Sequence, residues 1–307
     1  MTALAVAMGL LLPGIFIHLR PFVILLFGIM TFSGALKLTA KELGIAVQNP
    51  LAILLFFFIS HVIMPVIALF SSSLFFADLD LVTGFVLLFA GPTAVSGFIW
   101  VSIYKGDKAL GLTLILLSTL LAPLIVPFTL SVLIGEKVVL DMSGIAISLL
   151  FMVVIPTIIG VLINETSKGK IPKVICPGLD PFAKICLILV IAANSAVVAP
   201  NIRFDNLLIW QIALLCITLT VTGFILSKFT GILTKCGEEK SISLFFAGGL
   251  RNFSAVLTIA VAFFPESTAL PTLLCIVFQQ IIAAIMGKIM VRKTNSHGDT
   301  GDTENTK

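Results

Sequence analysis

Apolar runs long enough to cross a membrane follow one another along almost the whole chain, and they constrain its fold more than any other feature. A spanning helix needs roughly 17 to 25 mostly apolar residues, and only helices and closed barrels satisfy their backbone hydrogen bonds inside a bilayer. Breaks at Pro, Gly and charged clusters divide the chain into ten runs, so we predict an all-α polytopic membrane protein with ten transmembrane helices. The predicted spans are residues 2–18, 20–36, 47–70, 81–104, 108–134, 141–163, 179–199, 206–228, 239–264 and 268–292.

The basic residues give these spans an orientation. With the N-terminus in the cytoplasm, thirteen Lys and Arg residues fall in inner loops or the C-terminal flank and three in outer loops. This is the asymmetry of the positive-inside rule. We therefore expect a multi-pass protein of the cell (cytoplasmic or inner) membrane with both termini cytoplasmic, and a polar, disordered tail over residues 294–307. Met1 leads directly into an apolar run without a basic segment, so we expect no cleaved signal peptide.

The composition excludes several classes of protein. Hydrophobic residues make up 59% of the chain and charged residues 11%. The net charge of +4 comes mainly from loop residues that set orientation, so we expect the lipid bilayer and no nucleic acid as a partner. The five cysteines lie mostly in or beside apolar spans, which is typical of packing residues and not of a metal site or disulfide framework. No span carries a catalytic set, so we expect neither an enzyme nor a cofactor.

A short repeat links the predicted fourth and ninth spans. The segment Leu87-Leu-Phe-Ala-Gly91 recurs as Leu244-Phe-Phe-Ala-Gly248, five spans later. Because five is odd, the two halves, residues 1–137 and 138–293, must have opposite orientations, which is the inverted-repeat plan of secondary transporters. Each copy runs into a helix breaker at half the depth of the membrane. We therefore predict that helices four and nine are discontinuous and that both breaks lie near the midplane.

Arg251 lies deep inside the ninth span, directly after this break. A charge at that depth costs about 3 kcal/mol or more, so it is a functional-site hypothesis by default. Its guanidinium would pair with a substrate carboxylate, sulfate or phosphate, or it would be satisfied by helix-end carbonyls and water as a structural plug. Broken helix ends also expose backbone groups that bind ions. The candidate substrate-binding residues are Thr93, Ser96, Gly97, Gly248, Gly249, Arg251, Asn252 and Ser254.

Few other ionisable groups are expected inside the membrane. All acidic residues fall in loops, at span edges or in the tail, with Asp180 at the edge of the seventh span, so Arg251 has no expected carboxylate partner. His61, inside the third span, is a candidate carrier of a coupling proton or a hydrogen-bonded packing residue. Further cavity candidates, each of which could equally join neighbouring helices, are Ser60, Ser118, Thr119, Asn194 and Gln279.

Three segments resemble the bile acid:sodium symporter family, and the chain is similar to a divergent bacterial-type member. They are Phe27–Leu36 in the second span, Lys105–Leu110 with Ser118–Pro123 in and before the fifth, and Gly249–Phe264 in the ninth. The resemblance implies a panel domain of spans one, two, six and seven that moves against a core domain with crossed, discontinuous helices four and nine. It also implies transport of organic anions such as sterol acids or small carboxylates.

The family's sodium ligands are largely absent from the matching positions of this chain. The departures fall on Ser60, Gly97, Phe98, Gly111, Ile115, Ala247 and Arg251. Sodium is a hard cation that needs oxygen ligands, so we do not expect sodium bound by side chains, and coupling to protons stays open. Arg251 either acts as a tethered cation that replaces sodium or binds the anionic group of the substrate.

Two functions from different classes fit these features. The first is a secondary transporter of an organic anion, of the sterol acid or small carboxylate or sulfate type, that works by alternating access. The second is a transport-inactive membrane sensor or partner subunit that only binds such an anion. Counterflow in proteoliposomes distinguishes them.

Overall fold

The computed structural model describes residues 2–38, 50–135, 141–202 and 205–298. Within these ranges the chain is helical apart from short connections, as the apolar runs predict. Seven helical segments there are long and apolar enough to cross a membrane: Pro13–Ala35, Pro50–Phe75, Lys108–Leu133, Met142–Thr166, Lys170–Asn201, Leu207–Thr234 and Glu266–Met290. Three shorter apolar helices accompany them: Thr2–Leu11, Leu79–Ala90 and Phe253–Phe263.

Several of these segments are built from more than one helical element. The elements in chain order are α1 (Thr2–Leu11), α2 (Pro13–Phe16), η1 (Ile17–Phe22), α3 (Val23–Ala35), α5 (Pro50–Phe58), η2 (Ile59–Ile63), α6 (Met64–Phe75), α7 (Leu79–Ala90), α8 (Gly97–Ile103), α9 (Lys108–Leu133), α10 (Met142–Leu149), η4 (Leu150–Val154), α11 (Ile155–Thr166), α12 (Lys170–Val198), η5 (Ala199–Asn201), α13 (Leu207–Thr234), α14 (Glu238–Gly249), α15 (Phe253–Phe263) and α16 (Glu266–Gly298).

Proline accounts for two differences from the predicted boundaries. The predicted span 2–18 stops at Leu11, because Pro13 begins a new helical segment. In contrast, α12 begins at Lys170 and runs through Pro177 and Pro181, where a loop was predicted up to residue 178. Asp180, expected at a span edge, therefore lies inside a long helix. The local preference of proline for helix ends does not decide the boundary here.

The C-terminal helix also extends further than predicted. The tail was predicted to begin at residue 294, but α16 continues to Gly298. The rest of the predicted tail, residues 299–307, lies outside the described residues.

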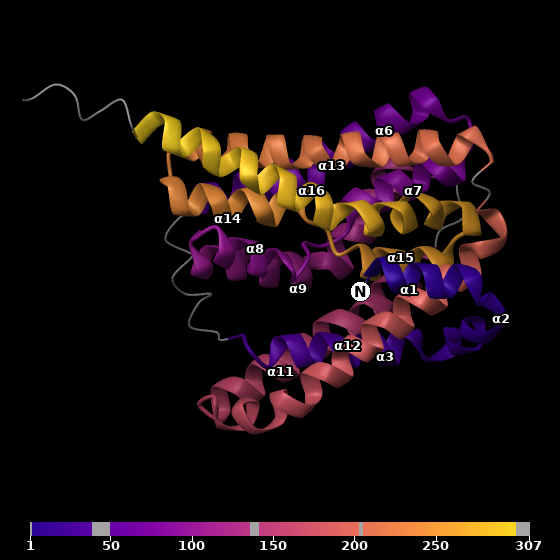
Figure 1. Ribbon diagram of the computed structural model, residues 1–307, viewed down its shortest axis with the longest axis horizontal. Coiled ribbons are helices and arrows are strands. Elements are labelled where there is room, and N and C mark those ends of the chain that lie inside the picture. The colour runs from indigo at the N-terminus through magenta and orange to yellow at the C-terminus, as the bar shows by residue number, and fades with distance from the viewer. Residues whose placement is uncertain (1, 39–49, 136–140, 203–204, 299–307) are drawn as a thin grey trace, which may run out of the picture.

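The helices form two groups, shown in the lower and upper halves of Figure 1. The panel comprises Thr2–Ala35 and Met142–Asn201, in which α12 packs against α1 and α3, and α3 against α11. The core comprises Pro50–Leu133 and Leu207–Gly298, in which α13 packs against α14 and α16, and α7 against α6 and α16. The two short broken pairs, α7 with α8 and α14 with α15, both belong to the core.

A π-helical turn in the third predicted span leaves one carbonyl without a helix partner. In η2 the Met64 N–H donates to the Ile59 carbonyl, five residues back. The Ser60 carbonyl would next pair with residue 65, but Pro65 has no N–H. The Ser60 carbonyl is therefore free to accept a hydrogen bond from elsewhere in the core.

Candidate functional site

The two helix breaks lie directly against each other. Thr93, between α7 and α8, and Arg251, between α14 and α15, form an antiparallel bridge. The Ala94 N–H donates to the Leu250 carbonyl at 3.0 Å, and the Asn252 N–H donates to the Pro92 carbonyl at 2.8 Å. The backbone groups freed by one break are thus satisfied by the other, which is how irregular backbone is tolerated inside a bilayer.

The Arg251 guanidinium binds carbonyl oxygens. Its Nη2 donates to the Ser60 carbonyl at 2.6 Å, the carbonyl that Pro65 leaves free, and its Nη1 donates to the Gly91 carbonyl at 3.3 Å. Gly91 follows the last residue of α7, where carbonyls lack helix partners and the helix dipole is negative. A cation is therefore well placed there.

Arg251 is buried as completely as any core residue. It is 1% exposed, and its Nε has no hydrogen-bond partner among the residues that the structure describes. In the described part of the chain, no carboxylate lies within salt-bridge distance of the guanidinium. Carbonyl partners were expected if Arg251 is a structural plug. They also fit a guanidinium that acts as a tethered cation in place of sodium.

A polar chain fixes Ser118 beside the same crossing. The Thr93 N–H donates to Ser118 Oγ at 2.9 Å, and Ser118 Oγ lies 3.2 Å from His61 Nε2. The His61 ring stacks on Phe57, with the centroids 5.3 Å apart. His61 thus follows Ser60, whose carbonyl accepts from Arg251. Through Ser118 it is also linked by hydrogen bonds to Thr93 at the crossing.

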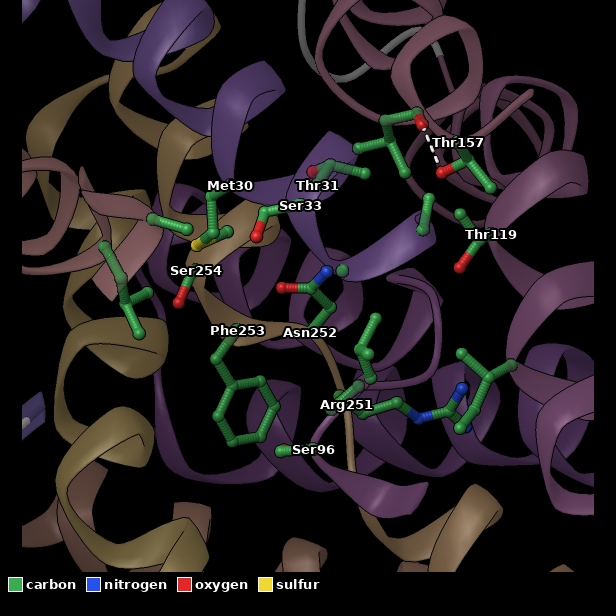
Figure 2. A pocket seen from close by; sticks show the side chains of 18 of the residues that line it. Met30, Thr31, Ser33, Ser96, Thr119, Thr157, Arg251, Asn252, Phe253 and Ser254 are labelled. Carbon is green, nitrogen blue, oxygen red and sulfur yellow. Dashed lines mark hydrogen bonds between the residues drawn. The ribbon is translucent and has the colours of Figure 1, made fainter. Parts of the chain in front are cut away.

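A cavity of about 430 Å³ lies between the panel and the crossing. Figure 2 shows Asn252 and Ser254 from the start of α15 facing Ser33 and Met30 of α3, while the Phe253 ring points away from them. The Arg251 side chain extends away from Asn252 in this view, toward the Ser60 and Gly91 carbonyls. The cavity therefore borders the fixed guanidinium, while its free polar groups come from other residues.

Six of the predicted site residues line this cavity: Ser96, Thr119, Arg251, Asn252, Ser254 and Gln279. Thr119 and Gln279 are 4% and 7% exposed, so they are buried polar groups of the cavity wall. The Gln279 Oε1 accepts no hydrogen bond from the residues that the structure describes. Asn252 caps α15, because its side chain accepts the Ala255 N–H at 3.2 Å.

The remaining predicted residues lie behind or beside the cavity. A Cβ on Gly248 would lie 1.9 Å from Ser227 Oγ, and one on Gly249 would lie 2.2 Å from the Phe224 ring, so these glycines permit close packing. Gly97 begins α8. Asn194 donates to Thr258 Oγ1 at 2.9 Å. Thr93, Ser60, Ser118 and His61 belong to the contacts around the crossing described above.

The charged end of the cavity was missed by the sequence analysis. Lys37, Asp180 and Lys184 line it, and Lys37 Nζ lies 2.6 Å from the Asp180 carboxylate, which also accepts from Ser33 Oγ at 3.0 Å. The signal was present in Asp180 and Lys184, which are four residues apart and share one helix face. Both residues fall within the predicted span 179–199, but Asp180 was assigned to the span edge and the pair was not considered together.

Gln280, next to Gln279 in the predicted tenth span, is a further polar residue of the site. It lines the cavity, accepts from Trp100 Nε1 at 2.9 Å and donates to Ser96 Oγ at 3.4 Å. It thereby ties α16 to the start of α8. In the described residues, no group of three His, Cys, Asp or Glu side chains could hold a metal ion.

An apolar helical chain in which two broken helices cross beside a polar cavity has the architecture of a membrane transporter. The chain belongs to the Sodium Bile acid symporter family, whose model matches residues 23–203. It is 38% identical over 268 residues to the "Uncharacterized protein YbaS" of Bacillus subtilis (strain 168), covering 87% of this chain and 88% of the relative.

Two further relatives carry the names of transporters. The "Uncharacterized sodium-dependent transporter YocS" of Bacillus subtilis (strain 168) is 22% identical, covering 93% of this chain and 88% of its own. The "Probable sodium/metabolite cotransporter BASS1, chloroplastic" of Arabidopsis thaliana is 23% identical, covering 94% of this chain and 72% of its own. The protein is therefore a membrane transporter and not an enzyme.

Proposed function

We propose that this protein is a secondary transporter that carries a small organic anion across the cell membrane by alternating access and needs no sodium ion. The observation that carries the proposal is the contact of the Arg251 guanidinium with the Ser60 and Gly91 carbonyls. This cation is covalently part of the chain. It supplies at the crossing the positive charge that a bound metal ion would otherwise have to bring.

The charge balance of the cavity favours an anionic substrate. Three basic side chains line it, Lys37, Lys184 and Arg251, against one acidic side chain, Asp180. Hydrogen-bond donors are also available, from the hydroxyls of Thr119 and Ser254 and the amide of Gln279. A carboxylate or sulfate would accept hydrogen bonds from several of these groups at once.

The same guanidinium disfavours sodium at the crossing. Sodium binds through oxygen ligands, and two carbonyl oxygens there are already used by Arg251. Two unit charges 4 Å apart repel by about 4 kcal/mol at an effective dielectric constant of 20. The relatives named as sodium cotransporters would therefore differ from this chain in coupling. A proton remains a candidate coupling ion, with His61 as its carrier.

The proposed topology is ten membrane crossings in two inverted halves, residues 1–137 and 138–293, with both termini cytoplasmic. The short helices α1, α7 with α8, and α14 with α15 supply the crossings that are not continuous long helices. The matching breaks after Gly91 and Gly249, and their mutual hydrogen bonds, support the repeat. A reporter fused behind Lys293 should be cytoplasmic.

The test is a ligand screen followed by flux measurements. Purified protein is screened against carboxylates, sulfates and sterol acids by thermal shift in choline buffer, because a ligand that binds the folded state raises its melting temperature. The best ligand is then measured for counterflow in proteoliposomes. Counterflow without sodium supports the proposal. Binding without counterflow would favour the sensor, and counterflow that requires sodium would refute the proposed coupling.

A further inference from the structure

At one end of the helices, three hydrogen bonds between described residues join the panel to the core. Arg20 Nη2 donates to the Val261 carbonyl at 3.2 Å, and Asn194 Nδ2 donates to Thr258 Oγ1 at 2.9 Å. Asn201 Nδ2 donates to the Glu266 carboxylate. Arg20, Asn194 and Asn201 belong to the panel, whereas their partners belong to α15 and the start of α16.

The charged end of the cavity lies at the opposite end of the same helices. Arg20 precedes α3 and Lys37 follows it, and a helix of 13 residues rises about 20 Å. Along α12, Asp180 precedes Asn194 by fourteen residues, a further rise of about 21 Å. The Lys37–Asp180 bond joins two panel helices, so it does not close the cavity against the core.

We propose that these three hydrogen bonds are the gate of the mouth on the Arg20 side. At the other end of the cavity the side chains of Lys37 and Asp180 are 52% and 30% exposed. The gate must break when the cavity opens on the Arg20 side. This inference rests on the proposed alternating access, and it assigns the residues that control one of its two steps.

The gate has a surface layer and a buried layer. Arg20, Asn201 and Glu266 are exposed, whereas Asn194 and Thr258 are 2% and 3% exposed. The Thr258 hydroxyl also donates to the Ser254 carbonyl at 2.9 Å, and Ser254 lines the cavity. A contact path therefore leads from the cavity wall to the buried gate bond.

The chemistry of the gate suits repeated opening. Arg20 binds a carbonyl in the last turn of α15, the end of a helix that carries partial negative charge. Glu266 lies in the first turn of α16, the end that carries partial positive charge. When the panel and core separate, water can replace each exposed partner at little cost. The buried Asn194–Thr258 bond then sets the closed position with a defined geometry.

The experiment uses the single reporter Ser254→Cys in right-side-out and inside-out vesicles, labelled with a membrane-impermeant maleimide. Protein without the reporter gives the background from the native cysteines. The double variant Arg20→Ala/Glu266→Ala removes two of the three gate bonds. It should raise the labelling rate from the Arg20 side about fivefold or more, since the loss of even one hydrogen bond shifts a two-state equilibrium by about that factor. Asp205→Asn, which removes an exposed charge near Asn201 but no gate bond, is the matched control.

A cross-link tests the same gate in the closing direction. Asn201→Cys/Glu266→Cys, bridged by a short cleavable thiol reagent, should lose at least about tenfold in transport and recover after reduction. The single variants should not respond to the reagent. Transport by the cross-linked protein at the rate of the single variants overturns the proposal, as does labelling from the Arg20 side that is equally fast in the parent and the double variant.

These readouts separate the gate from the proposed function. Labelling of Ser254→Cys needs no substrate, so it reports opening even when no transported anion is found. A parent protein that shows gated labelling without flux of any screened anion would refute the proposed function and leave the gate standing.

Discussion

Pro65 creates the hydrogen-bond acceptor that Arg251 occupies. Because Pro65 has no N–H, the π-helical turn before it leaves the Ser60 carbonyl unpaired, and Arg251 Nη2 donates to that carbonyl at 2.6 Å. A proline in one helix and an arginine in a distant broken helix therefore act as one unit. Neither residue has a full explanation without the other.

Replacing Arg251 tests its role as a fixed cation. Arg251→Gln should lower the melting temperature in choline buffer, because a charge-assisted hydrogen bond of about 1.5 to 3 kcal/mol is lost at a buried site. Added sodium should restore part of that loss, while Arg251→Lys should keep the charge but lose the second carbonyl contact. The measurement is thermal unfolding in choline, potassium and sodium buffers. A variant with the parent's melting temperature and unchanged anion binding would contradict the role.

Replacing Pro65 tests the coupling between the two residues. Pro65→Ala supplies an N–H that competes with Arg251 for the Ser60 carbonyl, so it should reduce transport although alanine favours helices. Combined with Arg251→Gln in a double-mutant cycle of unfolding free energies, it should show coupling of about 1 to 2 kcal/mol.

Pro156→Ala is the matched control for Pro65→Ala, because Pro156 follows the second π-helical turn, η4, in the same position. No arginine bonds there in the described residues. If Pro156→Ala coupled to Arg251→Gln as strongly as Pro65→Ala does, the coupling would not be due to the Ser60 carbonyl that Pro65 leaves free.

Ion replacement tests sodium independence. Exchanging sodium for potassium or choline at constant ionic strength should leave the initial uptake rate nearly unchanged, because the crossing already carries a cation. The rate is measured in proteoliposomes with the anion that the thermal-shift screen identifies. Saturable stimulation by sodium alone, severalfold in size, would show that other oxygens bind it.

Substitutions at two adjacent residues of α9 should affect different properties, one stability and the other substrate binding. Ser118→Ala leaves the buried Thr93 N–H without its acceptor, which costs about 1 to 3 kcal/mol, so stability should fall. Thr119→Val removes a hydroxyl that faces the cavity and should lower anion affinity while leaving the melting temperature unchanged. Thermal unfolding and ligand titration of both variants give the comparison. Equal effects of the two substitutions on melting temperature and on anion affinity would contradict these separate roles of Ser118 and Thr119.

Sequence patterns predicted the two helix breaks because glycine and proline act locally. The Gly91-Pro92 and Gly248-Gly249 pairs end their helices wherever the rest of the chain lies. The contact between the two breaks was implied only by the family resemblance. The start of α12 was not predictable from local rules, since Pro177 and Pro181 lie inside the helix instead of ending it.

The partners of Arg251 were only half predictable from sequence. Its depth identified it as special, and helix-end carbonyls were one of the two kinds of partner considered. The Ser60 carbonyl could not be selected, because its availability depends on a π-helical turn that hydropathy does not reveal. Similarly, Lys184 lies within the predicted span 179–199, but only the packing of the helices shows that it lines the cavity.

A positive charge that is built into the chain has an electrical consequence for the proposed carrier. A bound ion would be released with the substrate, whereas the Arg251 guanidinium stays with the protein through the whole cycle. If no proton is coupled to transport, the net charge moved per turnover is then that of the substrate alone. For a monovalent anion, a membrane potential of 100 mV, negative inside, contributes about 2.3 kcal/mol, or roughly a 50-fold bias toward export. Voltage would then set the preferred direction of this carrier.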